Sequence, residues 1–329
     1  MTKLRFGSDE EPGIRRRGSK RFTYFDERTH RAVTSRAELD RIKSLVVPPA
    51  WTDVWIAPDG DSHLQATGRD ARGRKQYRYH AAFVDDRANH KFADLVPFAA
   101  ALGPLRRRVD RDLRLGELSH DRVVATVVRL LDVTSLRVGN TEYAKSNRSF
   151  GLTTLRNRHV LVRGSTIHFE FRGKSAHEFD VTLENRRLAK IVRSCQHLPG
   201  QQLFEYKELD GTVRRVDSAD VNAYLGEHSR PGATAKTFRT WNATVRAAEA
   251  LFMATEQEEE PTAAVLNAAI DQVAGHLGNT RAVCRNSYIH PAIVEAYLDG
   301  NLARRWQRPV GQRANRLSVS EKKTVRLLK

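Results

Sequence analysis

The sequence predicts an α+β protein with a small β-rich N-terminal domain and a larger, mostly α-helical second domain. The chain has 329 residues, which exceeds the usual size of one hydrophobic core. Residues 21–80 hold short strand-like runs separated by turns, whereas long helical patterns dominate later in the chain. We therefore expect a first domain over 1–88 and a second over 89–329.

The charge of the chain indicates a polyanionic partner. Its formal net charge is +17 and its sequence pI is about 10.2, while a hydrophobic content of 40% argues for folded domains. Nucleic acid is favoured over a membrane surface, and the alternative is a supercharged soluble protein. The chain lacks a run of about 18 apolar residues and the apolar centre of a signal peptide, so we expect a cytoplasmic protein with no membrane partner.

No cofactor is expected. Cys195 and Cys284 lie far apart, without His or Cys at metal-ligand spacing, so both are interpreted as reduced thiols, and neither a disulfide nor a metal site is predicted. The acidic run at 256–261 would need convergent ligands from elsewhere to bind a metal. The sequence also holds no P-loop and no dinucleotide-binding fingerprint.

The pattern of the first domain predicts a small antiparallel sheet with one helix. Residues 1–20 are charged and rich in glycine and arginine, which predicts a mobile arm that contacts phosphates or remains a solvated tail. A helix should begin after Ser35, with Glu38 completing a capping box. The expected strands are KRFTYFD at 20–26, RAVT at 31–34, DVWIAP at 53–58, DSHLQATGRD at 61–70 and RKQYRYH at 74–80.

The last of these strands carries groups suited to DNA. Its side chains alternate between two faces, with Lys75, Tyr77 and Tyr79 on one and Gln76, Arg78 and His80 on the other. A basic strand of this kind can lie in the major groove, where Gln pairs with adenine and Lys or Arg with guanine while tyrosines reach phosphates. The alternative is an exposed edge strand guarded by charge. The predicted DNA contacts are Arg74, Lys75, Gln76, Tyr77 and Tyr79.

Two cations of the second domain are expected at turns. The apolar helix that starts near His120 is followed by a turn with Arg137 and by a second helix beginning near Asn140. An arginine beside a glycine at such a junction can direct its planar guanidinium group toward a phosphate. The alternative is a structural salt bridge. Lys174 precedes a strand at 177–181, so we expect it at an exposed β-turn tip, where it is either solvated or able to reach a bound duplex.

The remaining candidates lie near the end of the chain. Lys236 and Arg239 share a face early in the long helix that follows Gly232, where cations oppose the helix dipole, so an anionic ligand is indicated. Tyr288 follows a loop dense in polar groups and precedes Pro291, which should start the next helix. A phenol has a pKa near 10 and needs neighbouring cations to act as a nucleophile, and the alternative is an ordinary packing tyrosine. The other expected elements are hairpins at 158–173 and 206–216 and helices at 184–200, 217–228 and 261–278.

Together, these motifs resemble the poxvirus-like, bacterial type IB DNA topoisomerases over most of the chain. GRDARGRKQYRYH at 68–80 is similar to the DNA-contacting strand of that family. SLRVGN, FRGKS, KTFRTW and LGNTRAVCRNSYIHP carry, in order, Arg137, Lys174, Arg239, Asn279 and Tyr288. Many viral members and the related tyrosine recombinases have a histidine where this chain has Asn279, and the nearby His276 is out of register. The resemblance implies that the five residues are catalytic, with Asn279 donating one uncharged hydrogen bond to a phosphoryl oxygen.

The resemblance also implies an activity and an architecture. The activity is ATP- and metal-independent relaxation of supercoiled double-stranded DNA through a 3′-phosphotyrosyl bond on Tyr288. Arg137, Arg239 and Asn279 would stabilise charge on the phosphate. Lys174 would protonate the departing 5′-oxygen. The implied architecture is a tyrosine recombinase/topoisomerase IB-like catalytic domain with a small three-stranded sheet, within a monomeric, nucleoid-associated, C-shaped clamp that needs no protein partner.

Two other functions fit part of the pattern. A tyrosine recombinase shares the chemistry, but it would normally have a histidine where Lys236 stands and would oligomerise to pair two duplexes. A non-enzymatic DNA-binding protein accounts for the charge and the basic strand, but it does not account for five ordered catalytic residue types. Covalent adduct formation separates this binder from both enzymes, and strand exchange separates the recombinase from the topoisomerase.

Overall fold

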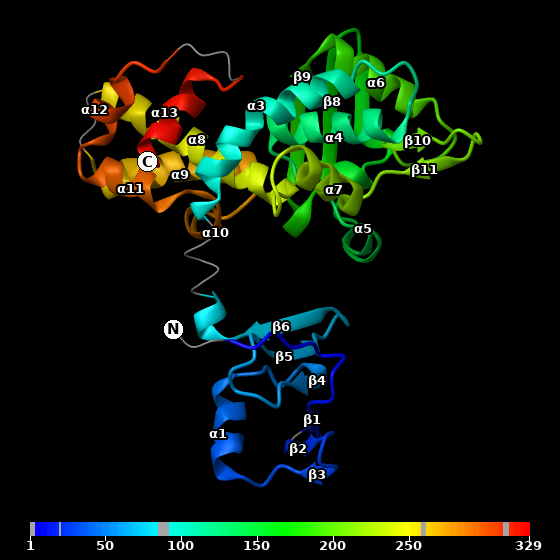
Figure 1. Cartoon of the computed structure of the whole chain (residues 1–329), viewed down its shortest axis with the longest axis vertical. Coiled ribbons are helices and arrows are strands. Elements are labelled where there is room, and N and C mark those ends of the chain that lie inside the picture. The colour runs from blue at the N-terminus through cyan, green and yellow to red at the C-terminus, as the bar shows by residue number, and fades with distance from the viewer. Residues whose placement is uncertain (1–3, 20, 85–91, 258–260, 312–315) are drawn as a thin grey trace. The chain divides into compact units, whose positions relative to one another are not determined.

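The computed structural model describes residues 4–19, 21–84, 92–257, 261–311 and 316–329 (Figure 1). The chain divides into two compact units, Met1–Ala93 and Asp94–Lys329. The domain boundary expected between residues 88 and 89 lies outside the described residues. The first unit is rich in strands and the second in helices, which confirms the predicted α+β class.

The N-terminal unit is built on a six-stranded antiparallel sheet with the strand order β3-β2-β1-β4-β5-β6. Helix α1, Arg36–Ser44, contributes Ile42 to a buried core with Ile14, Val54 and Ile56 of the sheet. Burying each such side chain stabilises the fold by about 1.5–3 kcal/mol. The strands are β1 (Ile14–Arg17), β2 (Thr23–Asp26), β3 (Arg31–Ala32), β4 (Thr52–Ile56), β5 (Leu64–Arg69) and β6 (Lys75–Tyr79).

The N-terminal arm contributes a strand to the middle of this sheet. The expectation of a mobile arm over residues 1–20 is therefore wrong for the part that the structure describes, because β1 pairs with both β2 and β4. Ile14 is only 2% exposed and anchors the strand in the core. The charges that suggested a solvated tail have specific partners, since Arg15 pairs with Glu27 and Arg16 donates to the Pro48 carbonyl.

Helix α1 begins where the sequence predicts, but the expected capping box is wrong. The Ser35 side chain makes no hydrogen bond to the helix. Glu38 instead forms an ion pair with Arg41, at 2.5 Å between Oε1 and Nη2. A carboxylate that binds a guanidinium one turn ahead cannot also reach back to the start of the helix, so the charge pair takes the place of the cap.

The C-terminal unit is mostly helical and includes the small three-stranded antiparallel sheet β7-β8-β9, as predicted. None of the helices that the structure describes is long and apolar enough to cross a membrane. The elements are α3 (Leu95–Asp112), α4 (His120–Thr134), α5 (Thr141–Asn147), β7 (Val160–Arg163), β8 (Thr166–Arg172), β9 (Glu178–Glu184), α6 (Arg186–Gln196), β10 (Glu205–Lys207), β11 (Val213–Arg215), α7 (Ser218–His228), α8 (Ala235–Glu256), α9 (Ala263–Leu277), α10 (Arg281–Tyr288), α11 (Pro291–Leu298), α12 (Leu302–Gln307) and α13 (Val319–Leu327).

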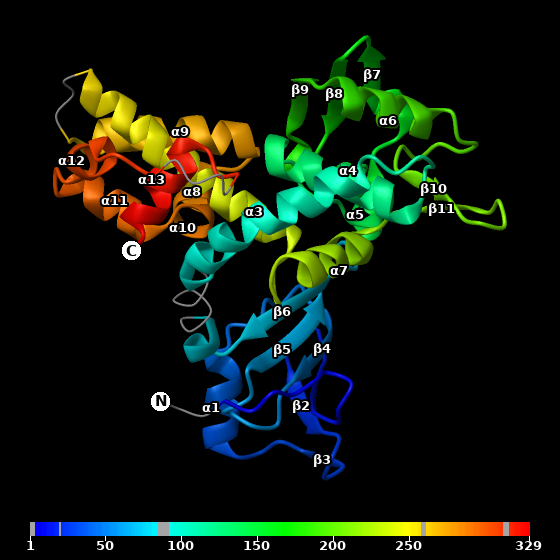
Figure 2. The same cartoon turned by 45° about the horizontal axis from the view of Figure 1, so that its top comes forward.

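Helix α8 is the central element of the C-terminal unit. Near its start, Phe238 meets Phe98 of α3 edge to face, with ring centroids 5.1 Å apart. Further along, Ala247 and Leu251 lie in a buried cluster with residues of α9, α11, α12 and α13. Figures 1 and 2 show α9–α13 gathered around one end of α8, while the three-stranded sheet lies with α4 and α6 toward the other end. Groups that project from α8 can therefore reach both halves of the unit.

The segment before Tyr288 is helical, which corrects the expectation of a loop. Helix α10 starts after Thr280, whose side chain accepts a hydrogen bond from the backbone N–H of Val283. Cys284 is fully buried, while the residues around it are mostly exposed. The polar residues that suggested a loop therefore form the exposed side of a short amphipathic helix. Pro291 begins α11, as predicted.

Candidate active site

Two arginines, Arg137 and Arg239, approach each other from the ends of two helices. After α4 ends, Ser135 adopts a left-handed backbone conformation with φ of 59°, and the chain then reaches Arg137. Gly139 has φ of +102°, a conformation that favours glycine, and the turn there packs closely against Gly151. Arg239 lies in the first turns of α8 and is 3% exposed.

Both guanidinium groups are fixed by the end of α9. The Leu277 carbonyl accepts hydrogen bonds from Arg239 at 2.9 Å and from Arg137 at 3.4 Å. The Ser135 carbonyl accepts a second bond from Arg239, at 2.5 Å, and Asn279 Oδ1 accepts one from Arg137 at 2.6 Å. The carbonyls at a helix C-terminus carry partial negative charge. Two like charges are thus held side by side by the backbone.

Tyr288 is the last residue of α10 and lies beside Arg239. The guanidinium carbon of Arg239 is 5.2 Å from the centroid of the tyrosine ring. The Thr244 hydroxyl, on α8, donates to the Tyr288 carbonyl at 3.1 Å and accepts from the backbone N–H of His290 at 3.2 Å. The backbone on both sides of the tyrosine is therefore tied to the helix that carries Arg239.

The surrounding cations change the acidity of the tyrosine. Burial acts to raise the pKa of Tyr288, but the charges of Arg239, Arg137 and Lys236 outweigh it and hold that pKa below its ordinary value. Burial and the charge of Arg137 lower the pKa of Arg239 to about 10. Phenolate formation is favoured at this position, which is the condition for a tyrosine to act as a nucleophile.

One cavity of about 280 Å³ brings these groups together. Its lining includes four of the five residues expected to be catalytic, namely Arg137, Lys174, Arg239 and Tyr288. Lys174 is exposed and comes from the 3-10 turn Lys174–Ala176 between β8 and β9. Asn279, the fifth residue, is joined to the group through its hydrogen bond to Arg137. Residues that are far apart in the sequence thus meet at one site.

The cavity includes further residues. Lys236, which the sequence places on one face with Arg239 and so beside an anionic ligand, lines it and lowers the pKa of Tyr288. Sequence reasoning misses two others. Tyr143 of α5 and Asn140, the N-cap of that helix, also line the cavity. Both belong to the motif SLRVGNTEY, in which the start of a polar helix close to Arg137 could have marked them.

Two buried donors around the cavity lack a hydrogen-bond acceptor among the residues that the structure describes. They are Nε of Arg239 and Nδ2 of Asn279. A buried donor without an acceptor costs about 1–3 kcal/mol, so a ligand that supplies acceptor oxygens would be stabilised here. The arrangement suits a tetrahedral anion such as a phosphate group beside Tyr288.

The side chains of His276, Cys284 and Cys195 are neutral at neutral pH. Burial, with the charges of Arg246 and Arg239, lowers the pKa of His276 to about 4. Burial raises the pKa of Cys284 to about 11 and that of Cys195 to about 12. Both cysteines are free and buried, in agreement with their interpretation as reduced thiols. The positive charge of the cavity therefore comes from its arginines and lysines.

The strand predicted to contact DNA is β6, at one edge of the N-terminal sheet. The rings of Tyr77 and Tyr79 stack 6.1 Å apart with their planes 9° from parallel, and Lys75 Nζ lies 5.7 Å from the Tyr77 ring centroid. These three side chains share one face, as the alternation predicts. Tyr77 is 47% exposed and Tyr79 is 44% exposed, so the face is open to a ligand.

The polar and basic residues among the predicted contacts, Arg74, Lys75 and Gln76, are held by acidic neighbours. Gln76 donates to Asp70 at 2.9 Å, and Arg74 forms an ion pair with the same carboxylate at 2.7 Å. Lys75 pairs with Asp9 at 2.6 Å. Such partly exposed ion pairs contribute little to stability, so exchanging a carboxylate for a phosphate would cost little.

Both units of the chain match models of known protein families. Residues 80–310 match the family model described as "Eukaryotic DNA topoisomerase I, catalytic core", and residues 21–70 match "Bacterial DNA topoisomerase IB, N-terminal domain". DNA topoisomerase 1B of Acanthamoeba polyphaga mimivirus is 31% identical over 86% of each chain. DNA topoisomerase 1 of Rabbit fibroma virus (strain Kasza) is 24% identical over 77% of this chain and 80% of the relative. A XerH recombinase bound to difH aligns with 57% of this chain and 49% of its own, at 12% identity and a TM-score of 0.35, which is too weak to support a statement about fold.

Proposed function

This chain belongs to the type IB DNA topoisomerase family, and from that membership we propose that it relaxes supercoiled DNA by cutting and rejoining one strand with Tyr288. The supporting observation is the cavity in which two arginines and two lysines surround a tyrosine of lowered pKa. The family supplies the class of reaction, that of an isomerase with a tyrosine nucleophile. The assignment of individual residues rests on the geometry of the cavity.

The proposed cleavage is a transesterification at phosphorus. The Tyr288 oxygen forms a bond to phosphorus, the bond from phosphorus to the 5′-oxygen breaks, and the 3′ end remains as a phosphotyrosyl ester. Lys174 gives a proton to the departing 5′-oxygen, with help from Arg137, because an alkoxide is a poor leaving group. Rotation of the freed end releases supercoils, and the 5′-hydroxyl then attacks the ester in the reverse reaction. One phosphodiester replaces another, so the exchange requires neither ATP nor a metal.

Arg137, Arg239 and Asn279 are proposed to bind the nonbridging phosphate oxygens. Arg239 is held by two carbonyl oxygens, so its guanidinium needs little reorganisation when negative charge develops. Its Nε and the Nδ2 of Asn279 are two buried donors near the cavity for which the described residues supply no acceptor. Asn279 contributes a directed dipole instead of a charge, so the two arginines and Lys236 supply the positive potential.

The exposed face of β6 is proposed to contact the duplex together with the catalytic unit. Tyr77 and Tyr79 offer stacked rings and hydroxyls, and Lys75, Arg74 and Gln76 offer donors to phosphates and base edges. We propose that the two units close around DNA as a monomeric clamp and that the protein acts on the nucleoid in the cytoplasm. The net charge of +17 supports a nucleic-acid partner.

Relaxation is expected to proceed in EDTA and without ATP. The built-in cations take the place of a metal, and the exchange of one phosphodiester for another needs no energy source. Incubating the protein with negatively supercoiled plasmid in EDTA should therefore yield relaxed topoisomers. A requirement for magnesium or ATP would contradict the proposed mechanism, and a protein that binds the plasmid without relaxing it would contradict the proposed activity.

The cleavage rate is expected to rise with pH until Tyr288 is ionised, at a pKa below that of a free tyrosine. Because Lys236 helps to lower this pKa, Lys236→Ala should raise it and move the rate profile to higher pH. The measurement is single-turnover formation of the covalent adduct from neutral to alkaline pH. Lys207→Ala, which changes an exposed lysine of β10, is the matched control. An unshifted profile in Lys236→Ala would contradict the electrostatic role of Lys236.

A further inference from the structure

Ser135 connects the two catalytic arginines. Its carbonyl accepts a hydrogen bond from Arg239, and Arg137 follows it by two residues. Ser135 is 2% exposed and holds the left-handed backbone conformation, which is unfavourable for a residue other than glycine. Contacts around Ser135 must therefore keep it in this conformation, and those contacts control the directions of both arginines.

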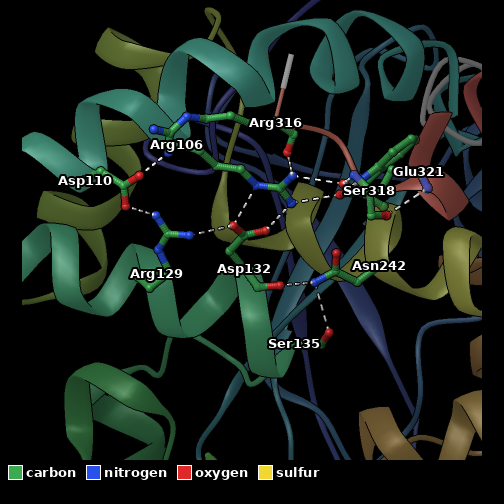
Figure 3. Close-up of polar contacts among 10 residues, drawn as sticks. Arg106, Asp110, Arg129, Asp132, Ser135, Asn242, Arg316, Ser318 and Glu321 are labelled. Carbon is green, nitrogen blue, oxygen red and sulfur yellow. Dashed lines mark hydrogen bonds and ion pairs between the residues drawn. The ribbon is translucent and has the colours of Figure 1, made fainter. Parts of the chain in front are cut away.

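Asn242 supplies the contact at the end of α4. It lies on α8, three residues after Arg239, and its Nδ2 donates to the Asp132 carbonyl at 2.9 Å and to the Ser135 hydroxyl at 3.0 Å. Figure 3 shows Asn242 bridging these two residues. Helix α8, which carries Arg239, is thus hydrogen-bonded to the turn that leads to Arg137. A shift of Asn242 or of Asp132 would move both arginines together.

Asp132 is held in turn by a bifurcated ion pair. Arg106 of α3 donates to both carboxylate oxygens of Asp132, at 2.9 and 2.8 Å, and to both carboxylate oxygens of Glu321, also at 2.9 and 2.8 Å (Figure 3). The side chains of Arg106, Asp132 and Glu321 are 15%, 6% and 8% exposed. One guanidinium therefore joins two nearly buried carboxylates from different helices, α4 and α13, with good geometry.

Glu321 of α13, which binds Arg106 of α3, also contacts α8. Trp241, next to Asn242 on α8, is fully buried and donates from Nε1 to Glu321 Oε1 at 3.0 Å. Glu321 also accepts from the backbone N–H of Ser318 at 2.7 Å, which orders the start of α13. Helix α13 is thus connected with Ser135 along two paths, one through α3 and α4 and the other along α8.

We propose that Asn242, together with the ion-paired residues Arg106, Asp132 and Glu321, forms a positioning relay through which the C-terminal helix α13 holds Arg239 and Arg137 in their catalytic geometry. The inference rests on the proposed function, because it assumes that the two arginines bind the phosphate. None of the four relay residues lines the catalytic cavity, so they act through Ser135. Buried ion triads are often replaceable by apolar side chains without loss of stability, which favours a role in geometry for this one.

The test is the rate of covalent-adduct formation in single turnover, measured beside the dissociation constant for the same DNA. Asn242→Ala is expected to slow adduct formation on the order of 10- to 100-fold, because displacement by about 1 Å can cost 10²-fold, while binding stays near that of the wild type. Glu321→Gln, which keeps the side-chain shape, should give a smaller slowing of the same kind. If Asn242→Ala does not fold, the adduct-formation rate of Glu321→Gln tests the relay in its place.

The matched control is Ser320→Ala. Ser320 of α13 donates to Glu249 of α8 at 2.9 Å, so the variant removes a bond between the same two helices that does not lead to Ser135. Its rate of adduct formation should equal that of the wild type. Equal slowing in Ser320→Ala and Asn242→Ala would mean that helix packing alone is responsible, and it would overturn the relay.

A double-mutant cycle with Arg239→Ala separates positioning from general destabilisation. If Asn242 acts by orienting the two arginines, then Asn242→Ala should cause a smaller loss of rate in the Arg239→Ala background than in the wild type, because only Arg137 is left to be misplaced. The relay would be overturned if the rate losses of Asn242→Ala and Arg239→Ala multiply in the double variant. It would also be overturned if Asn242→Ala forms the adduct at the wild-type rate, or if its loss of DNA affinity matches its loss of rate. Adduct formation by Tyr288→Phe would instead overturn the proposed function, so the two failures are distinguishable.

Discussion

Tyr288→Phe is expected to bind DNA and to leave supercoiled plasmid unrelaxed. The substitution removes only the phenolic oxygen, and the ring keeps its place beside Arg239. Removing a nucleophile from an enzyme that acts through a covalent intermediate costs on the order of 10⁶-fold in rate, so relaxation should fall below detection. The measurement is plasmid relaxation together with trapping of protein–DNA adducts by detergent.

Tyr206→Phe is the control for this variant. Tyr206 lies on β10, is 9% exposed, and makes only a long hydrogen bond of 3.4 Å from its hydroxyl to Glu208. The change is chemically the same but is made outside the catalytic cavity, so relaxation and adduct formation should be retained. Undiminished relaxation by Tyr288→Phe would show that another group attacks the phosphate.

Four of the five residues that the resemblance implies are catalytic line one cavity, and each stands in a short motif with a local chemical meaning. A short stretch of sequence is enough to place Arg137 near Gly139, Lys174 at a turn and Arg239 near the start of a helix. The structure then gathers Arg137, Lys174 and Arg239 around Tyr288. Local patterns also gave the helices and the three-stranded sheet, because their hydrophobic spacing is regular.

The contacts that hold the arginines could not be predicted. Arg106 and Glu321 are 215 residues apart, and neither has a neighbouring residue that indicates its partner. Asn242 is an ordinary polar residue in a long helix, and its role depends on the left-handed turn at Ser135. Such long-range contacts exist only after the helices have packed, so a single sequence gives no pattern for them.

Two predictions from the sequence were wrong, one for the N-terminal arm and one for the segment before Tyr288. In both segments, polar or charged side chains suggested an exposed, irregular chain. The arginines after Ile14 suggested a solvated arm, but they belong to the core strand β1, where Glu27 binds Arg15 and backbone carbonyls bind Arg16. The polar run before Tyr288 suggested a loop, but one buried residue, Cys284, is enough to fix one face of α10. In both segments one apolar side chain outweighs its charged neighbours, because burial depends on tertiary contacts.

Lys174→Ala and Arg239→Ala are each expected to slow adduct formation by about 10²–10³-fold, but for different reasons. Loss of Lys174 removes the acid that is proposed to protonate the 5′-oxygen. Loss of Arg239 removes positive charge from the phosphate and from the surroundings of Tyr288. Rates on ordinary DNA cannot distinguish the two roles, because both losses slow the same step.

A DNA substrate with sulfur in place of the bridging 5′-oxygen separates these roles. A thiol has a pKa near 8.5, so a thiolate leaves without protonation, whereas an alkoxide needs an acid. Lys174→Ala should therefore regain most of the wild-type rate on this substrate, while Arg239→Ala should stay slow because the phosphate charge is unchanged. Lys207→Ala should match the wild type on both substrates. If Lys174→Ala instead stays as slow as Arg239→Ala on this substrate, Lys174 acts as another phosphate-binding cation, and the proton would then have to reach the leaving oxygen from Arg137 or water.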